Sequence, residues 1–367
     1  MIDRSNKFNV KGQIEKIIWI TFYWVLFSVF QFLTGYSTLL YLDVDLGNLS
    51  QVSFLNGSII SGIISGLLGG SLIVFFWEKW LRTKSYKWSI LNIFWSYTLI
   101  FFIVQLIGDS FLPRPEQHVA LIHSDSWKGL MTTITSISFI QSYLSWLVIT
   151  IITLIALLVN DKYGPGVFVS FLLGKYFHPK REERIFMFLD LRGATTIAEK
   201  LGEIKYFNFL KDVFRDSTPD ILRSKGEIYQ YVGDEIVISW KKESGTQNAN
   251  CLQCFFGIQQ RLLESASYYK ETYNGIVPQF KAGLHFGFVM VGEIGVVKRD
   301  IAYSGDVLNT AARIQAKCNE LGVNILISKN LLVKLGSLPT LFKPKEIGNI
   351  ALRGKHDAVT LYTVHMN

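Results

Sequence analysis

Charge is scarce in the first half of this chain, and cysteine is scarce throughout. The 367 residues contain 37 Lys and Arg and 29 Asp and Glu, but residues 1–160 hold only 10 and 8 of them. Eight of the nine Trp lie in the same half. This imbalance excludes a single ordinary soluble domain, and a hydrophobic content of 49% excludes a disordered chain. The split predicts two parts that face different solvents, first a bilayer and then water.

The cysteines are only three, Cys251, Cys254 and Cys318, and all lie in the second half. They are too few for a disulfide framework, and free thiols are typical of a reducing compartment, so we expect the second half to be cytosolic. The net charge of +8 is modest, and no basic stripe with interleaved aromatic residues is present. The charge therefore favours an anionic lipid surface as partner and argues against nucleic acid.

Four long runs contain no Asp, Glu, Lys or Arg, and each exceeds the roughly 20 residues that cross the hydrocarbon core. The runs are Ile17–Leu42, Leu46–Trp77, Trp88–Gly108 and Gly129–Asn160. They predict a membrane domain of residues 1–160, an all-α four-helix transmembrane bundle with spans at about 17–41, 54–77, 88–108 and 136–159.

The orientation of these spans follows from the basic residues between them. Residues 1–16 and 78–87 each carry four Lys or Arg, whereas residues 43–45 carry none and residues 109–128 carry two. Because basic residues favour the cytoplasmic side, we expect a multi-pass protein of the cell (inner) membrane with both termini in the cytoplasm.

The second run contains small residues four positions apart, Gly62, Gly66 and Gly70. Such spacing lets two helix backbones approach closely, either at a dimer seam or inside one bundle, and the sequence leaves both readings open. No ionisable residue lies inside any span, which argues against an ion carrier. The signal that the membrane domain senses is unknown from sequence. Residues 161–183 form a linker too short to decouple its two ends, so we expect it to act as a transducer.

Residues 184–367 have the pattern of an α/β domain. We expect a strand over Ile185–Asp190, a helix reaching about Val213, a hairpin over Glu227–Trp240, a helix over Asn248–Tyr268, and a second hairpin of Phe280–His285 with Phe288–Gly292. The order strand-helix-strand-strand-helix-strand predicts a ferredoxin-like α/β sandwich.

Two aspartates stand out in this pattern. Asp190 ends the first strand, and Asp234 lies at the turn of the following hairpin. Neighbouring carboxylates at a sheet end repel each other unless a cation lies between them, and Mg²⁺ commonly combines one or two carboxylates with substrate phosphates. The backbone of Gly193, Ala194, Thr195 and Thr196 at the start of the next helix suits a polyphosphate.

Five segments in sequence order resemble class III adenylate and guanylate cyclases. They correspond to the first metal motif, the second metal motif, the glycine-rich hairpin, the Asn-x3-Arg helix and the closing strand, and they are Phe188–Thr196, Tyr231–Ile236, Ala282–Gly295, Gly305–Arg313, and Leu352–Lys355 with Val359–Val364. The resemblance implies a cyclase that converts ATP to 3′,5′-cyclic AMP and pyrophosphate.

The resemblance also implies the roles of particular residues. Asp190, Asp234 and the carbonyl of Leu191 would hold two divalent cations per site, Mg²⁺ or Mn²⁺. Arg313 would stabilise negative charge at the α-phosphate and Asn309 would orient the ribose. Lys355 joins the phosphate-binding candidates. Because one protomer of such a cyclase supplies the metal ligands and its partner supplies the ribose and phosphate residues, a homodimer is expected.

The chain departs from the family at the two positions that read the purine. These positions carry Gln230 and Ala302, which match neither the adenine pair nor the guanine pair of the family. Gln carries both a donor and an acceptor, so it could pair with either base edge. We expect ATP as the substrate, on prior frequency alone, with GTP as the alternative. The alternatives are a cyclase of relaxed ATP/GTP choice, a non-catalytic cyclase-like membrane receptor or dimerisation partner, and a small transporter with a nucleotide-binding tail.

Overall fold

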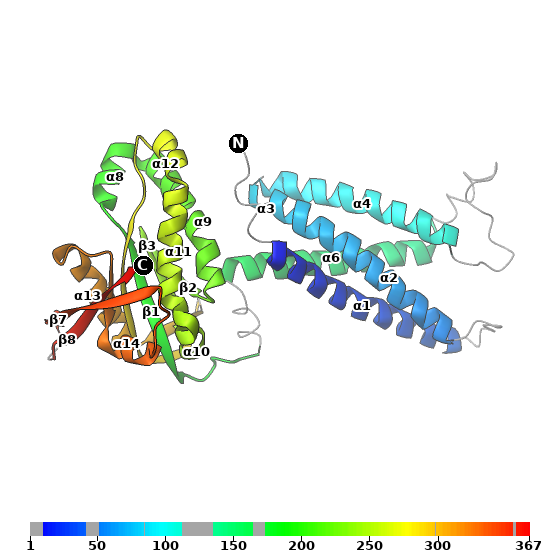
Figure 1. Cartoon of the computed structure of the whole chain (residues 1–367). Helices are drawn as coiled ribbons and strands as arrows, with labels where there is room; N and C mark the ends of the chain where they lie inside the picture. Colours follow the sequence, from blue (N-terminus) through cyan, green and yellow to red (C-terminus); the bar gives the residue numbers. More distant parts are fainter. Residues whose placement is uncertain are drawn as a thin grey trace. The chain divides into compact units, whose positions relative to one another are not determined.

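The chain forms two compact units, Met1–Tyr163 and Gly164–Asn367. The structure, a computed structural model, describes residues 10–41, 51–83, 85–111, 135–163, 173–297, 299–354 and 357–367. Figure 1 shows a helical unit and an α/β unit.

The first unit is made of helices only in its described residues. They are α1 (Val10–Tyr41), α2 (Gln51–Leu72), the π-helix η2 (Ile73–Trp77), α3 (Glu78–Thr83), α4 (Tyr86–Phe111) and α6 (Ile137–Tyr163). Over the described residues, three stretches are long and apolar enough to cross a membrane: Gly12–Thr38, Leu55–Leu81 and Phe139–Asn160. A shorter apolar stretch, Lys87–Ile103, lies in α4, so the span predicted at about 88–108 stays a prediction.

The glycines of α2 face α1 of the same chain. A Cβ added at Gly62 would lie 2.8 Å from Cα of Val25, and one added at Gly66 would lie 2.6 Å from Cα of Thr21. Such a close approach of two backbones requires residues without side chains. Of the two readings that the sequence left open, the structure therefore supports packing inside one bundle.

The second unit contains eight strands and seven α-helices within residues 173–297, 299–354 and 357–367. The strands are β1 (Lys180–Leu191), β2 (Glu227–Val232), β3 (Glu235–Lys241), β4 (Phe280–Ile294), β5 (Asp300–Ser304), β6 (Ile325–Ser328), β7 (Phe342–Ile350) and β8 (Val359–Met366). The helices are α8 (Ala194–Leu201), α9 (Glu203–Arg223), α10 (Lys242–Thr246), α11 (Asn250–Glu264), α12 (Ala266–Thr272), α13 (Asp306–Glu320) and α14 (Lys329–Leu335), with a 3₁₀ turn η3 at Gln247–Ala249.

The strands form one mixed sheet in the order β2-β3-β1-β4-β6-β8-β7, with β5 paired to β4. Its first four strands are antiparallel neighbours, as the ferredoxin-like prediction requires. Strand β6 extends this unit in parallel with β4, and the β8–β7 pair follows at the edge.

Two details differ from the sequence expectation. The predicted hairpin of Phe280–His285 with Phe288–Gly292 is wrong, because β4 runs unbroken through both segments and pairs with β1 from Leu191↔Phe280 to Lys180↔Val291. Gly287 is not a turn residue: a Cβ there would lie 2.5 Å from the side chain of Val307, so glycine allows α13 to approach. The helix predicted to reach Val213 is divided at Gly202, which has φ of 73°.

The sheet carries apolar side chains on both faces because alternate residues of a strand point to opposite sides. Ile185, Met187 and Leu189 of β1 belong to the main core with residues of α9 and α11. Phe186 of the same strand packs on the opposite face with Val307 and Ala311 of α13. A Cβ at Gly283 of β4 would collide with the backbone nitrogen of Gln315, so α13 lies directly on the sheet.

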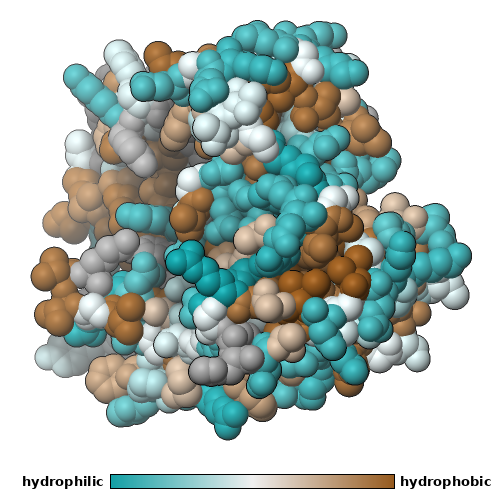
Figure 2. Space-filling model, turned by 90° about the vertical axis from the view of Figure 1, so that its left-hand side faces the viewer, coloured by the Kyte–Doolittle hydropathy of each residue, from teal (hydrophilic) through white to brown (hydrophobic). Residues whose placement is uncertain are grey.

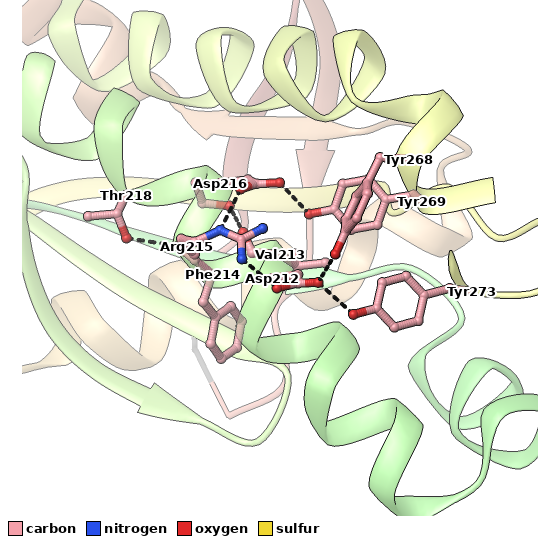
Figure 3. Close-up of polar contacts among 10 residues, drawn as sticks. Asp212, Val213, Phe214, Arg215, Asp216, Thr218, Tyr268, Tyr269 and Tyr273 are labelled. Carbon is pink, nitrogen blue, oxygen red and sulfur yellow. Dashed lines mark hydrogen bonds and ion pairs between the residues drawn. The ribbon is translucent and has the colours of Figure 1, made fainter. Parts of the chain in front are cut away.

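A cluster of acids and tyrosines fixes α9 against α12 and the residues that follow it (Figure 3). The hydroxyls of Tyr268 and Tyr273 each donate to Oδ2 of Asp212 at 2.6 Å, and Tyr269 donates to Oδ2 of Asp216 at 2.8 Å. Arg215 pairs with the other oxygen of both aspartates, at 2.6 and 3.0 Å. These charge-assisted contacts hold α9 against α12 and Tyr273.

Candidate functional site: a carboxylate cluster at the sheet end

Asp190 lies at the end of β1, between β3 and β4. Its backbone neighbours across the sheet are Glu235 of β3 and Lys281 of β4. Oδ2 of Asp190 lies 2.9 Å from Nζ of Lys281 and accepts a hydrogen bond from Nε2 of Gln315 at 2.7 Å. The carboxylate is therefore held by one positive charge and one amide, and it stays accessible at the sheet end.

Asp234 lies in the β2–β3 turn beside Asp190. Burial raises the pKa of Asp234, and a hydrogen bond and negative charge from Asp190 raise it further. Glu235 adds a third acid, and burial together with the charges of Asp190 and Asp234 raises its pKa to about 7. Burial raises the pKa of the Tyr206 hydroxyl in α9, and the nearby negative charges of Asp234 and Asp190 raise it further.

This arrangement fits a hard divalent cation. Two carboxyl groups that lie this close, with Asp190 raising the pKa of Asp234, would be stabilised by a positive charge placed between them. Leu191, whose backbone carbonyl is the third predicted ligand, follows Asp190 directly and is buried. Within the described residues, no group of three or more His, Cys, Asp and Glu is arranged to hold a metal. Two carboxylates with substrate phosphates are the usual pattern for Mg²⁺.

The start of α8 follows the metal candidates directly. Gly193 precedes the helix with φ of 67°, and no side chain caps the first turn. Thr195 and Thr196 are exposed and Ala194 is half-buried. The first amides of this helix are therefore free to donate to an anion. Lys355, the other predicted phosphate residue, lies outside the described residues.

Helix α13 turns Asn309 and Arg313 away from the aspartates of its own chain. Asn309 is exposed and Arg313 half-buried, whereas Gln315 is buried and contacts Asp190. Residues two apart on a helix point about 200° apart, so Gln315 and Arg313 face nearly opposite directions. The guanidinium of Arg313 instead lies near Gly354, with Nη2 3.4 Å from the position of a Cβ there.

The two predicted purine positions lie on β2 and β5, two strands that contact each other through side chains without pairing in the sheet. Gln230 of β2 is exposed and Ala302 of β5 is half-buried. The rings of their neighbours Tyr229 and Tyr303 are 4.9 Å apart in an edge-to-face contact. The structure thus brings β2 and β5 together beside α13, although they do not pair.

Three residues of the cluster were missed from sequence: Lys281, Glu235 and Gln315. Lys281 and Glu235 contribute because the strand register places them opposite Asp190. The only sequence signal was their position next to the motifs already identified. Gln315 contributes because α13 packs directly on β4, which no sequence pattern indicates.

Comparison with known proteins agrees with this fold. The family model for the adenylate and guanylate cyclase catalytic domain matches residues 178–366, so this chain belongs to that family. It is 37% identical over 199 residues to adenylate cyclase 2 of Rhizobium meliloti (strain 1021), covering 54% of each chain. It is 29% identical over 184 residues to an adenylate cyclase of Anabaena cylindrica, covering 48% of this chain and 36% of the relative.

Among solved structures, a bacterial light-regulated adenylyl cyclase matches with a TM-score of 0.52 at 23% identity. The match covers 63% of this chain and 66% of that one and supports the fold alone. The chain spans about half the length of the first relative and about a third of the second.

Proposed function

We propose that this protein is a membrane-bound class III nucleotidyl cyclase that converts ATP to 3′,5′-cyclic AMP and pyrophosphate. The observation that carries the proposal is the contact between Asp190 and Asp234 at the sheet end, directly before the free amides of α8. Relatives named as adenylate cyclases support the same reading.

The proposed chemistry uses residues of the cluster in separate roles. Asp190, Asp234 and the Leu191 carbonyl would hold two Mg²⁺ or Mn²⁺ ions, which activate the 3′-hydroxyl and neutralise the phosphates. The amides of Gly193–Thr196 would donate to phosphate oxygens. The positive charge of Lys281, which pairs with Asp190, would offset part of the negative charge of the bound phosphates. Gln315 orients Asp190 through its amide.

We further propose that the active form is a homodimer. Arg313 and Asn309 face away from the aspartates on the same chain, so a complete site needs these residues from a second copy. Several large apolar side chains of the unit are exposed and available to a partner, among them Phe288, Met290 and Ile294. Figure 2 shows apolar patches between hydrophilic areas on one face of the molecule. The proposed membrane domain, with both termini in the cytoplasm, would regulate this dimer.

The test is a cyclisation assay on the full chain in phospholipid nanodiscs, with ATP or GTP in Mg²⁺ or Mn²⁺, and mass spectrometry of the products. We expect cyclic AMP and pyrophosphate from the wild type and less than about a tenth of that rate from Asp190→Ala. Glu264→Gln, which removes an exposed helix carboxylate, is the matched control. A wild type that binds nucleotide without forming a cyclic product would favour the non-catalytic receptor instead.

A further inference from the structure

Arg184 is a charged side chain buried in the sheet, with only 1% of its side chain exposed. Its Nε donates to Oε2 of Glu182 at 2.8 Å. Its Nη1 donates to Oε2 of Glu227 at 2.5 Å and to Oγ of Ser239 at 3.1 Å. The guanidinium carbon also lies 4.8 Å from the centroid of the Tyr303 ring. A planar guanidinium suits several acceptors and a ring at once, which a lysine ammonium does not.

The partners of Arg184 lie on the two strands that carry the purine positions. Glu227 is the first residue of β2, three residues before Gln230. Tyr303 lies on β5 next to Ala302. Because β2 and β5 do not pair with each other, the side chain of Arg184 and the Tyr229–Tyr303 contact bridge them.

The end of the linker docks on the same charge cluster. Tyr176 is 5% exposed and packs with Phe186 and Val289. Its hydroxyl donates to Oε1 of Glu182 at 3.1 Å, and its carbonyl accepts from the amide of Glu293 at 3.1 Å. Glu182 therefore receives Tyr176 on one oxygen and Arg184 on the other.

Glu182 keeps its charge in this position. Burial opposes the ionised form, but the hydrogen bond and charge of Arg184, with the hydrogen bond of Tyr176, outweigh burial and lower the pKa of Glu182. An ionised carboxylate accepts from both partners, so the phenol and the guanidinium are joined through one group.

We propose that Arg184 is a positioning residue that connects residues 173–179, the described linker residues before β1, to both strands that carry the purine positions. A displacement of Tyr176 moves Glu182 and Arg184, and with them the spacing of β2 and β5. Asp190 lies six residues further along β1, about 20 Å away, so the metal candidates are little affected. The effect on purine recognition rests on the proposed function. The link from Tyr176 through Glu182 and Arg184 to β2 and β5 does not depend on that function.

The experiment compares Tyr176→Phe with Tyr362→Phe in the full chain in nanodiscs. Both changes remove one phenolic hydroxyl that donates to a glutamate, and Tyr362 donates to Glu346 at the β7–β8 edge. Hydrogen exchange is followed in residues 227–232 and 300–304, and kcat and KM are measured for ATP and GTP. Tyr176→Phe should raise exchange in both segments by about 3- to 10-fold, the effect of losing one hydrogen bond of ordinary strength. The kcat/KM ratio of ATP to GTP should change by about 3-fold or more, through KM rather than kcat.

Arg184→Lys is the second variant, and it should reproduce both effects more strongly because it keeps the charge but loses the fork and the ring contact. Exchange in β2 and β5 that is equal in Tyr176→Phe and Tyr362→Phe overturns the connection, even if Arg184→Lys does not fold. Raised exchange with an unchanged purine ratio also overturns the positioning role. A wild type that makes no cyclic nucleotide refutes the proposed function alone, since the exchange result stands independently.

Discussion

Glu235→Gln should stabilise the second unit when no metal is bound. Glu235 is half-buried at the start of β3, opposite Asp190 in the sheet. Burial and the negative charges of Asp190 and Asp234 raise its pKa to about 7. Ionising this carboxyl in the folded protein therefore costs free energy that the unfolded chain does not incur, and a neutral amide of the same shape removes that cost.

The magnitude follows from the shift. The pKa of Glu235 rises from 4.5 to about 7, and each unit corresponds to about 1.4 kcal/mol, so the ceiling is about 3 kcal/mol. Solvent screening of a partly exposed group reduces this to about 1–2 kcal/mol. Because the pKa of Glu235 is higher in the folded than in the unfolded state, the contribution of Glu235 to stability is greatest below about pH 4.5 and is lost as the pH rises through about 7. The gain in unfolding free energy of Glu235→Gln over wild type should reach its full size at pH 8 and be small at pH 5.

The three cysteines provide an assay confined to this unit. Cys251, Cys254 and Cys318 are buried and free, and the chain contains no others. Their reaction with a thiol-specific dye in the full chain therefore reports unfolding of the second unit only. Wild type and variant are compared at the same pH with chelator present, so that differences in dye chemistry cancel.

Two results would refute this reasoning. Equal unfolding free energies for Glu235→Gln and wild type at pH 8 would show that the charges of the cluster do not interact as the structure indicates. A gain in unfolding free energy that is as large at pH 5 as at pH 8 would show that Glu235→Gln stabilises the unit through packing and not through charge. Excess Mg²⁺ or Mn²⁺ should reduce the difference in unfolding free energy between Glu235→Gln and wild type at pH 8. The control Glu264→Gln should have the same unfolding free energy as wild type at every pH.

Two further predictions concern the dimer and the purine. Co-expression of Asp234→Ala with Arg313→Ala should restore activity well above either variant alone, because the heterodimer can form one intact site; background activity in a verified heterodimer would contradict the two-chain site. Wild type should separate ATP from GTP by only about 1–3 kcal/mol, and Gln230→Lys with Ala302→Asp should sharpen the preference for ATP. An unchanged kcat/KM ratio in the double variant would show that these residues do not face the purine.

The metal candidates could be predicted from sequence because each ends a recognisable local pattern. Asp190 follows an apolar strand and Asp234 follows a glycine in a hairpin turn, and both patterns are short. The hairpin predicted within Phe280–Gly292 failed for a related reason. A glycine at position 287 has the same local appearance whether it makes a turn or admits a neighbouring helix, and only the position of Val307 decides between them.

The neighbours of Asp190 could not be predicted, since they depend on register and packing between distant segments. Lys281 lies opposite Asp190 only because β4 runs unbroken beside β1, and Gln315 reaches it only because Gly283 allows α13 onto the sheet. This same packing decides how the site is completed. Once Gln315 contacts the aspartate of its own chain, the helix geometry directs Arg313 to the opposite side. The proposed homodimer is therefore supported by the helix packing that Gly283 allows, in addition to the catalytic motifs.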